Sequence, residues 1–363
     1  MLALALLCPH SPVAADSESS LISVAPGYWV TTGDTVYGRS LHSATLLKNG
    51  EVLVVGGQSE NPSSAELYDP RTGTWALTGF MQTYRFEHTA TLLGDGSVLV
   101  AGGHNSVTEL PQSEAEIYDP TAGVWHVTRS MAAAREAHTA TLLPGGQVLV
   151  TGGISLRAVA ATAEVFQPVT RTWIKAGHMS QPRADHQAVL LPDGRVLVAG
   201  GWDGQSSFYS GLASADLFDP MTRTWTPTGS MAQGRDVFVG ALLPTGKVLV
   251  AGGCCDANLD VLASAELYDP ATGEWTPTGS MVQARDWASA SLLSDGLVLV
   301  AGGWDGSNVL NSAELYDPAT GTWSTTASMT FPRWQYTTTR LLNGRVLAAG
   351  GAITSELYIP PSS

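Results

Sequence analysis

A glycine pair that recurs seven times along the chain is the feature that most constrains the fold. Successive pairs are separated by 46 to 52 residues, and an arginine precedes each pair by 17 residues. Self-similarity at a fixed period indicates a repeat architecture, so the 363 residues are expected to form one repeat domain and not two or three unrelated ones. The glycine pairs are residues 56–57, 102–103, 152–153, 200–201, 252–253, 302–303 and 350–351.

Each repeat contains four short apolar segments with the composition of strands. In the third repeat they read HTATLL, QVLVTGG, TAEVF and TWIKAG. Asn49-Gly50 and similar pairs join the first two segments, where a tight hairpin requires positive φ. Asp69-Pro70 and its equivalents join the last two, because proline starts a turn and cannot continue a central strand. The sequence therefore predicts four antiparallel strands per repeat.

The fourth segment of the last repeat is missing from the C-terminal end. Six repeats carry a tryptophan there, whereas the seventh ends as SELYIPPSS without one. The phrase GYWVTTGD, with Trp29, stands instead near the N-terminus. We therefore expect an N-terminal strand to complete the last repeat, which closes the ring and removes an open sheet edge.

An aromatic residue followed seven positions later by tryptophan, after a glycine pair and a variable loop, resembles the kelch repeat. Tyr68 to Trp75 and Phe166 to Trp173 are two of the six copies, and the period agrees with the roughly 50 residues of that family. The resemblance covers about residues 28 to 361. It implies an all-β, seven-bladed kelch-type β-propeller of four antiparallel strands per blade.

The N-terminal segment indicates where the protein is located, and the net charge limits the partners that it can bind. Residues 1–15 resemble a signal peptide, with an apolar run and the small-residue sequence Val13-Ala14-Ala15, and residues 16–27 are expected to be a linker. A lipid anchor on Cys8 is the alternative. The expected location is outside the cytoplasm: secreted, periplasmic or at the cell surface. A net charge of −14 argues against nucleic acid as a partner, no transmembrane segment is expected, and a monomer is expected.

The seven arginines open the innermost strand of each repeat. Acids near the start of the third strands are expected at the same end of the propeller, so a structural ring of ion pairs is favoured over an anion-binding crown. The arginines are Arg39, Arg85, Arg135, Arg183, Arg235, Arg285 and Arg333. The acids are Glu66, Glu116, Glu164, Asp216, Glu266, Glu314 and Glu356.

Histidine and cysteine offer two weaker signals. His42, His88, His138 and His186 follow four successive arginines by three positions. We favour hydrogen-bonded strand histidines over a metal site, because adjacent blades would spread the ligands around an arc. No metal and no cofactor are expected. Adjacent cysteines at 254 and 255 leave a strained vicinal disulfide and two free thiols equally open.

Aromatic residues outside the repeat positions gather in repeats four to seven. They are expected at one face of the propeller, where stacking would suit a sugar ring or a peptide. The candidate ligand-binding residues are Trp202, Asp203, Tyr209, Trp287, Trp304, Asp305, Trp334 and Tyr336.

The sequence favours a secreted module that binds a protein or a carbohydrate on this face. The alternative is a carbohydrate-active enzyme of the kelch-propeller class, similar to a sugar oxidase or a mutarotase. The chain has no Tyr-His dipeptide of the kind found in galactose-oxidase-like copper sites. No catalytic residues are assigned, and an enzyme is the less favoured reading.

Overall fold

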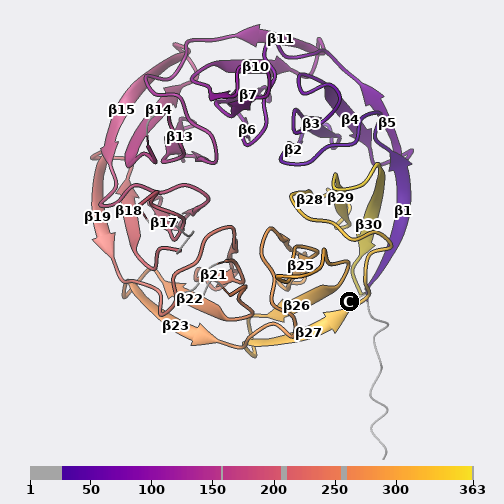
Figure 1. Ribbon diagram of the computed structural model, residues 1–363, viewed down its shortest axis with the longest axis vertical. Helices are drawn as coiled ribbons and strands as arrows, with labels where there is room; N and C mark the ends of the chain where they lie inside the picture. The colour runs from indigo at the N-terminus through magenta and orange to yellow at the C-terminus, as the bar shows by residue number, and fades with distance from the viewer. Residues whose placement is uncertain (1–26, 157, 206–210, 255–259, 362–363) are drawn as a thin grey trace, which may run out of the picture.

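Seven four-stranded antiparallel sheets surround a central axis like the blades of a propeller (Figure 1). The computed structural model describes residues 27–156, 158–205, 211–254 and 260–361. Over these ranges every regular element is a strand. The all-β, seven-bladed fold and the four strands per blade predicted from the repeats are confirmed. The expected signal peptide and almost all of the expected linker lie outside the described residues.

In each blade the strands are given from the axis outward. Blade 1 consists of β2 (Ser43–Leu46), β3 (Val52–Val55), β4 (Ala65–Asp69) and β5 (Thr74–Leu77). Blade 2 consists of β6 (Thr89–Leu92), β7 (Val98–Ala101), β10 (Ala115–Asp119) and β11 (Val124–Val127), and its loop carries the short pair β8 (His104–Asn105) and β9 (Leu110–Pro111). Blade 3 consists of β12 (Thr139–Leu142), β13 (Val148–Thr151), β14 (Thr162–Gln167) and β15 (Thr172–His178).

The remaining blades follow the same order. Blade 4 consists of β16 (Gln187–Leu190), β17 (Val196–Ala199), β18 (Ala215–Asp219) and β19 (Thr224–Thr228). Blade 5 consists of β20 (Val239–Leu242), β21 (Val248–Ala251), β22 (Ala265–Asp269) and β23 (Glu274–Thr278). Blade 6 consists of β24 (Ser289–Leu292), β25 (Val298–Ala301), β26 (Ala313–Asp317) and β27 (Thr322–Thr326). Blade 7 consists of β28 (Thr337–Arg340), β29 (Val346–Ala349), β30 (Thr354–Ile359) and β1 (Tyr28–Asp34).

The second strand of every blade is buried at all four of its positions. In blade 1 it reads VLVV, and blades 2, 4, 5 and 6 read VLVA. A continuous apolar run fits a strand that neighbouring blades cover on both faces, whereas an exposed strand would alternate. The core is therefore divided into packed layers between adjacent blades. One such layer joins Val52 and Val54 of blade 1 to Leu347 of blade 7.

The first strand in the sequence closes the ring. β1 pairs antiparallel with β30, with Trp29 opposite Tyr358. Their ring centroids are 5.2 Å apart, and the Trp29 indole donates to the carbonyl of Ala327 in blade 6 at 3.0 Å. The other six blades repeat the ring contact within one sheet, as with Tyr118 and Trp125, and five of them repeat the indole hydrogen bond; the Trp75 indole of blade 1 lacks it. The predicted completion of the last blade by the N-terminal strand is confirmed.

The two ends of the propeller carry different loops. The hairpin turns between first and second strands lie at one end, together with the turns between third and fourth strands. The arginines, the glycine pairs and the long loops lie at the other end, which we call the channel-mouth face. This asymmetry follows from antiparallel pairing, because alternate connections in a four-stranded meander fall at opposite ends.

Candidate binding site at the channel mouth

Each of the seven arginines forms an ion pair with the acid of its own repeat. The guanidinium and carboxylate groups are almost completely buried in every pair. The pairs are Arg39–Glu66, Arg85–Glu116, Arg135–Glu164, Arg183–Asp216, Arg235–Glu266, Arg285–Glu314 and Arg333–Glu356.

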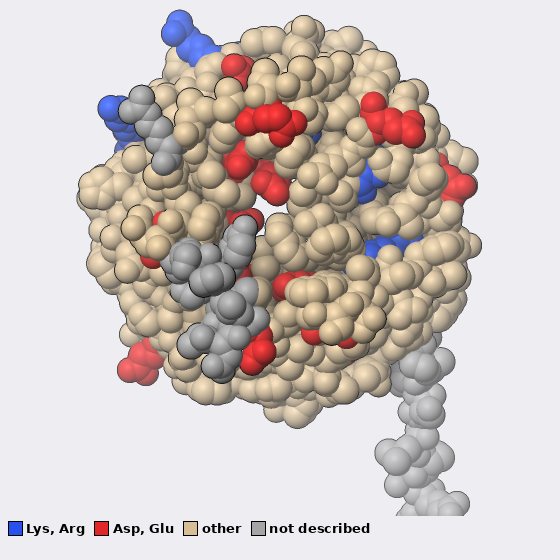
Figure 2. Space-filling model, in the orientation of Figure 1, with Lys and Arg blue, Asp and Glu red and all other residues tan. Residues whose placement is uncertain are grey.

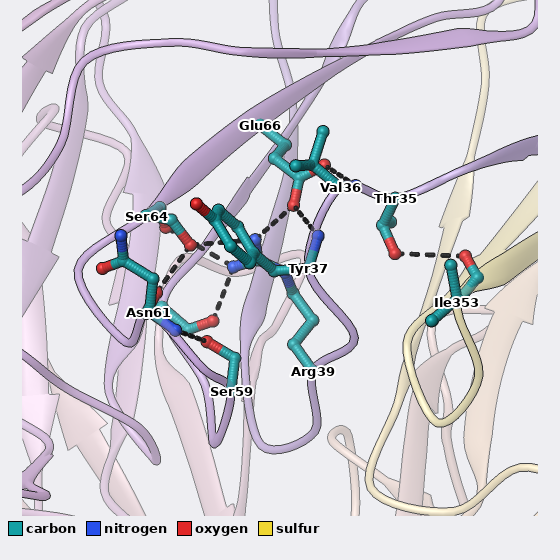
Figure 3. A network of polar contacts seen from close by, with 10 residues as sticks. Thr35, Val36, Tyr37, Arg39, Ser59, Asn61, Ser64, Glu66 and Ile353 are labelled. Atoms are coloured by element: carbon teal, nitrogen blue, oxygen red, sulfur yellow. Dashed lines mark hydrogen bonds and ion pairs between the residues drawn. The ribbon is translucent and has the colours of Figure 1, made fainter.

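The network around Arg39 shows how these groups are used (Figure 3). Its guanidinium donates to the carbonyl of Gly56 at 2.7 Å and to the Ser64 hydroxyl at 3.1 Å, besides the pair with Glu66. Glu66 also accepts the backbone N–H of Val36 at 2.7 Å. Burial lowers the pKa of Arg39, and the charge of Glu66 opposes that shift. Both charges are thus engaged inside the blade, which leaves no open anion site at this position.

The backbone of each arginine links its blade to the one before. The N–H of Gly57 donates to the Arg85 carbonyl at 2.9 Å, and Gly351 closes the series by donating to Arg39 at 3.0 Å. Gly56 has φ of +63°, and a Cβ there would lie 2.5 Å from the Arg85 carbonyl oxygen. The glycine pair is therefore required both by the backbone conformation and by the approach of the next blade.

A second ring, of backbone only, surrounds the channel two residues after the arginines. Leu41 donates its N–H to the Gln335 carbonyl at 2.9 Å, and Glu87 donates to Leu41 at 3.0 Å. The series continues through every blade and returns to its start, with φ between 45° and 54° at all seven positions. This conformation costs a non-glycine residue roughly 1 to 2 kcal/mol. The closed hydrogen-bond ring holds it in place.

The side chains of this second ring line a cavity of about 280 Å³ at the channel mouth. All seven blades contribute to its wall, together with the residue that follows in each blade. The seven side chains are all of different types, in contrast to the seven arginines. They are Leu41, Glu87, Ala137, Asp185, Val237, Trp287 and Gln335.

The four histidines form inter-blade hydrogen bonds on the innermost strands. Nε2 of His88 lies 2.8 Å from the Ser43 hydroxyl of blade 1, and Nε2 of His42 lies 3.0 Å from the Thr337 hydroxyl of blade 7. Burial, with help from the charge of Arg39, lowers the pKa of His42 to about 3. Burial also lowers the pKa of His138 to about 3. These imidazoles are neutral at physiological pH and hold blades together.

Five carboxylates gather around the mouth of the channel. They belong to the first and second positions after the arginines in blades 2 to 6, and Figure 2 shows acidic side chains around the central opening. Within the described ranges no lysine or arginine forms an ion pair with any of them. The five are Glu87, Glu136, Asp185, Asp236 and Asp286.

Burial raises the pKa values of Glu87, Asp185, Asp236 and Asp286, and neighbouring carboxylates add to the shift at the first three. Burial, followed by the charge of Glu136, raises the pKa of Glu87 to about 7. Burial raises the pKa of both Asp236 and Asp286 to about 7. The pKa of Asp185 lies well above its ordinary value, first through burial and then through the charges of Glu87, Asp236 and Glu136. The surroundings of the mouth therefore oppose the ionisation of these four carboxyl groups.

One histidine contacts two carboxylates near the mouth. His104, on β8, contacts the Glu136 carboxylate through Nδ1 and lies 3.4 Å from Glu109 through Nε2. The two carboxylates raise the pKa of His104 although its partial burial opposes that shift. The charge of His104 also opposes the upward pKa shift of Glu87, but neither Glu87 nor Asp185 forms an ion pair among the described residues.

The four tryptophans singled out from the sequence all lie on the channel-mouth face. Trp287 belongs to the second ring and lines the cavity. Trp202 and Trp304 follow the glycine pairs and form backbone bridges to Ala184 and Asp286, respectively. The three are partly buried, whereas Trp334 is 40% exposed.

The remaining candidate residues that the structure describes form two groups. Asp203 and Asp305 accept backbone N–H bonds inside their own turns, at 2.9 Å from Gln205 and 2.7 Å from Asn308. Tyr336 is buried in the cavity wall, where its hydroxyl donates to the carbonyl of Ala301 at 2.8 Å. It thus packs in the scaffold and does not present its ring on the outer face.

Two expectations fall partly or wholly on residues outside the described ranges. Tyr209 lies there, so its place on the face stays a prediction. Cys254 is disulfide-bonded. Cys255 lies outside the described residues, and the nature of the pairing stays open.

Sequence reasoning missed the acids of the mouth. It compared the repeats at the third position after the arginine, where the histidines stand, and overlooked the first and second positions. The signal was present there: the second position changes type in every repeat, and five successive repeats carry an acid at one of these two positions. In the described part of the chain, no group of three or more His, Cys, Asp or Glu side chains is placed to hold a metal ion. No helix in these ranges is long and apolar enough to cross a bilayer.

Comparison with known families decides the classification. The family described as the KLHDC2/KLHL20/DRC7 Kelch-repeats domain matches residues 137–351, more than half of the chain. The Kelch motif matches residues 39–77 and 87–132. The chain belongs to the kelch-repeat family. A search of curated proteins found no match.

Solved structures share the fold at low sequence identity. A fungal alcohol oxidase of the AA5 family, in complex with copper, is 18% identical with a TM-score of 0.74 over 92% of this chain and 76% of its own. A protein named YjhT is 16% identical with a TM-score of 0.63 over 84% of this chain and 100% of its own. These similarities show the fold alone, and what such a propeller does depends on the site that it carries.

Proposed function

We propose that this kelch protein is an exported binding module that takes a protein or carbohydrate ligand at the channel-mouth face. The observation that supports this most directly is the second ring. Seven positions with one backbone conformation carry seven different side chains around a cavity. A purely structural ring would have no physical need for such variety, since the hydrogen bonds that close it use only the backbone.

The surface around the cavity has the chemistry of a binding face. Trp287 lines the wall, and Trp334 of the next blade is 40% exposed. Exposed indoles bind sugar rings or peptide side chains by stacking and by burial of apolar area. No residue is assigned a catalytic role, which separates this proposal from the alternative of a sugar oxidase or mutarotase.

The test is a screen of residues 16–363 against a glycan array and a peptide library. We expect a ligand whose binding is lost in the double variant Trp202→Ala, Trp304→Ala, while the melting temperature changes little. The matched control is Trp173→Phe at the rim of blade 3, where the indole belongs to the repeat framework and donates to Arg129. A ligand that binds both variants as well as the parent protein would contradict a site on this face.

A further inference from the structure

The charge of the channel mouth defines the ligand more narrowly than the aromatic residues do. Glu87 and Asp185 belong to the second ring and line the cavity itself. Neither carboxylate has a hydrogen-bonding partner among the described residues, although both residues are partly buried. Two unpaired carboxylates in one cavity of about 280 Å³ repel each other unless a cation or protons lie between them.

Two buried carboxylates behind this wall point to the same conclusion. Asp236 and Asp286 are each 3% exposed, and Oδ1 of each lacks a hydrogen-bond partner. A buried polar atom without a partner is rare and costly, so such an atom calls for a ligand or another explanation. Asp236 precedes the cavity residue Val237 and is among the charges that act on Asp185. The carboxylate of Asp236 therefore contributes to the electrostatic field that acts on Asp185.

The wall across from Glu87 completes the site. Trp287 lies three to four blades away around the ring, on the far side of the same cavity. An indole face attracts an ammonium or guanidinium group, and carboxylates on the other side add direct ion pairing. Aliphatic Leu41 and Val237 supply apolar wall between them, which suits the methylene stem of a long basic side chain.

We propose that the channel mouth binds one lysine or arginine side chain of a partner protein, with its cationic end between Glu87 and Asp185 on one wall and Trp287 on the other. This rests on the proposed function, since it names the ligand class of the same site. The rim favours a protein over a free amine, because exposed Trp334 offers apolar area to the residues that flank the inserted side chain. The net charge of −14 would further steer a basic partner toward the protein.

The experiment uses the tripeptide acetyl-glycyl-arginyl-glycinamide and its citrulline analogue, which is neutral and nearly isosteric. Calorimetric titration of residues 16–363 at pH 7.5 and low salt should show binding of the arginine peptide. The citrulline peptide should bind weaker by roughly tenfold or more, because it removes the charge and keeps the shape. Equal affinity for the two peptides, or no binding of the arginine peptide, would overturn the proposal.

Matched variants locate the site. Asp185→Asn should weaken binding of the arginine peptide by roughly tenfold or more, and Glu87→Gln should act in the same direction. Asp295→Asn is the control: it lies in a hairpin turn at the opposite end, where Oδ1 accepts the Leu297 N–H at 3.1 Å, and an asparagine retains this bond. An Asp185→Asn protein that melts as high as the parent and binds the peptide unchanged would refute the assignment.

Two further measurements distinguish the sources of the cation. n-Butylguanidine should bind more weakly than the arginine peptide, whereas equal affinity would favour a small free amine and overturn the protein source. Calcium chloride that displaces the peptide in a competitive titration and binds tighter would make the mouth a metal site instead. These experiments also distinguish this inference from the proposed function. If the parent protein binds a neutral ligand and the Trp202→Ala, Trp304→Ala variant does not, the binding face is supported and the basic side chain is rejected as its ligand.

Proton release gives an independent signature of ionised carboxylates around the cation. The groups that face Glu87 are Glu136 and His104, and those that face Asp185 are Glu87, Glu136 and Asp236. A cation stabilises their charged forms, so binding at pH 7 should release protons in titrations that compare buffers of different ionisation enthalpy. Proton uptake on binding would contradict the geometry.

Discussion

The arginine ring and the ring two residues later differ in what the seven blades hold constant. At the first ring the side chain is the same in every blade, and its guanidinium is buried against the same kind of acid. At the second ring the backbone is the same, with φ near 50°, and every side chain differs. Two adjacent layers of one propeller therefore follow opposite rules.

This difference separates framework from recognition. The arginines stabilise the framework, because each one contacts its own blade through its side chain and the preceding blade through its backbone carbonyl. The second ring needs only N–H and C=O groups for its closure, so its side chains are free to vary. Even Val237, whose branched side chain disfavours positive φ, accepts this conformation. Variation on a fixed backbone is what a binding surface requires.

Removing the strand that closes the ring would break both layers at once. Deleting residues 28–34 leaves β30 with an unpaired edge and removes the Trp29 contact with Ala327. We expect aggregation or failure to fold, since an open sheet edge invites pairing with other chains. Size-exclusion chromatography and thermal melting would measure this. The control is the chain that begins at residue 16 with β1 intact, and a monomeric, equally stable deletion would show that β1 is dispensable for closure.

Removing one arginine would break the framework and spare the recognition layer. Arg135→Ala leaves Glu164 buried without its cation, which should lower the free energy of unfolding by about 3 to 5 kcal/mol. Denaturant unfolding measures this loss. The double variant Arg135→Met, Glu164→Leu should recover part of it, because no unpaired charge remains. Affinity of the folded protein for a mouth ligand should barely change, whereas a stable variant that loses an anionic ligand would restore the anion-binding crown.

The framework could be predicted from the sequence because it repeats. The same features recur in successive repeats: the glycine pair, the turn residues and the seven-residue step seen from Tyr68 to Trp75. Each copy therefore supports the strand assignment of the others. The displaced Trp29 revealed the ring closure for the same reason. The pairing of arginines with acids followed from strand direction alone, and the structure has all seven pairs.

The binding site could be predicted only in part, because recognition depends on what does not repeat. Tryptophan is a typical residue of binding surfaces, so the sequence named Trp287 and Trp334 as candidates. Glu87 and Asp185 are ordinary surface residues in the sequence, and only the αL backbone turns them toward one cavity. Tyr336 stays a prediction as a ligand contact: it lines the cavity, and its buried ring is fixed by the hydrogen bond from its hydroxyl to the Ala301 carbonyl.

The smallest expected effect comes from the substitution of a single carboxylate, which tests the same contrast between the two rings. Asp286 is 3% exposed, and burial raises its pKa from 3.8 to about 7. Above pH 7 the folded protein must hold this charge in a poorly solvated place, next to the charge of Asp236. Below about pH 4 the group is protonated in both the folded and the unfolded state, so its contribution to stability vanishes relative to a neutral residue.

Asp286→Asn should therefore raise the free energy of unfolding by about 1 to 3 kcal/mol at pH 8, with the gain shrinking as the pH falls through 7 and absent near pH 4. Denaturant melts of the parent and variant at a series of pH values measure this difference. The control Asp295→Asn, in an exposed turn at the opposite end, should give no such pH-dependent gain. An Asp286→Asn variant less stable at pH 8 than at pH 4, relative to the parent, would mean that the folded protein stabilises the charged carboxylate. The mouth would then stabilise its ionised acids without a ligand. At this position the contrast between a framework whose charges are paired and a binding layer whose charges are not would fail.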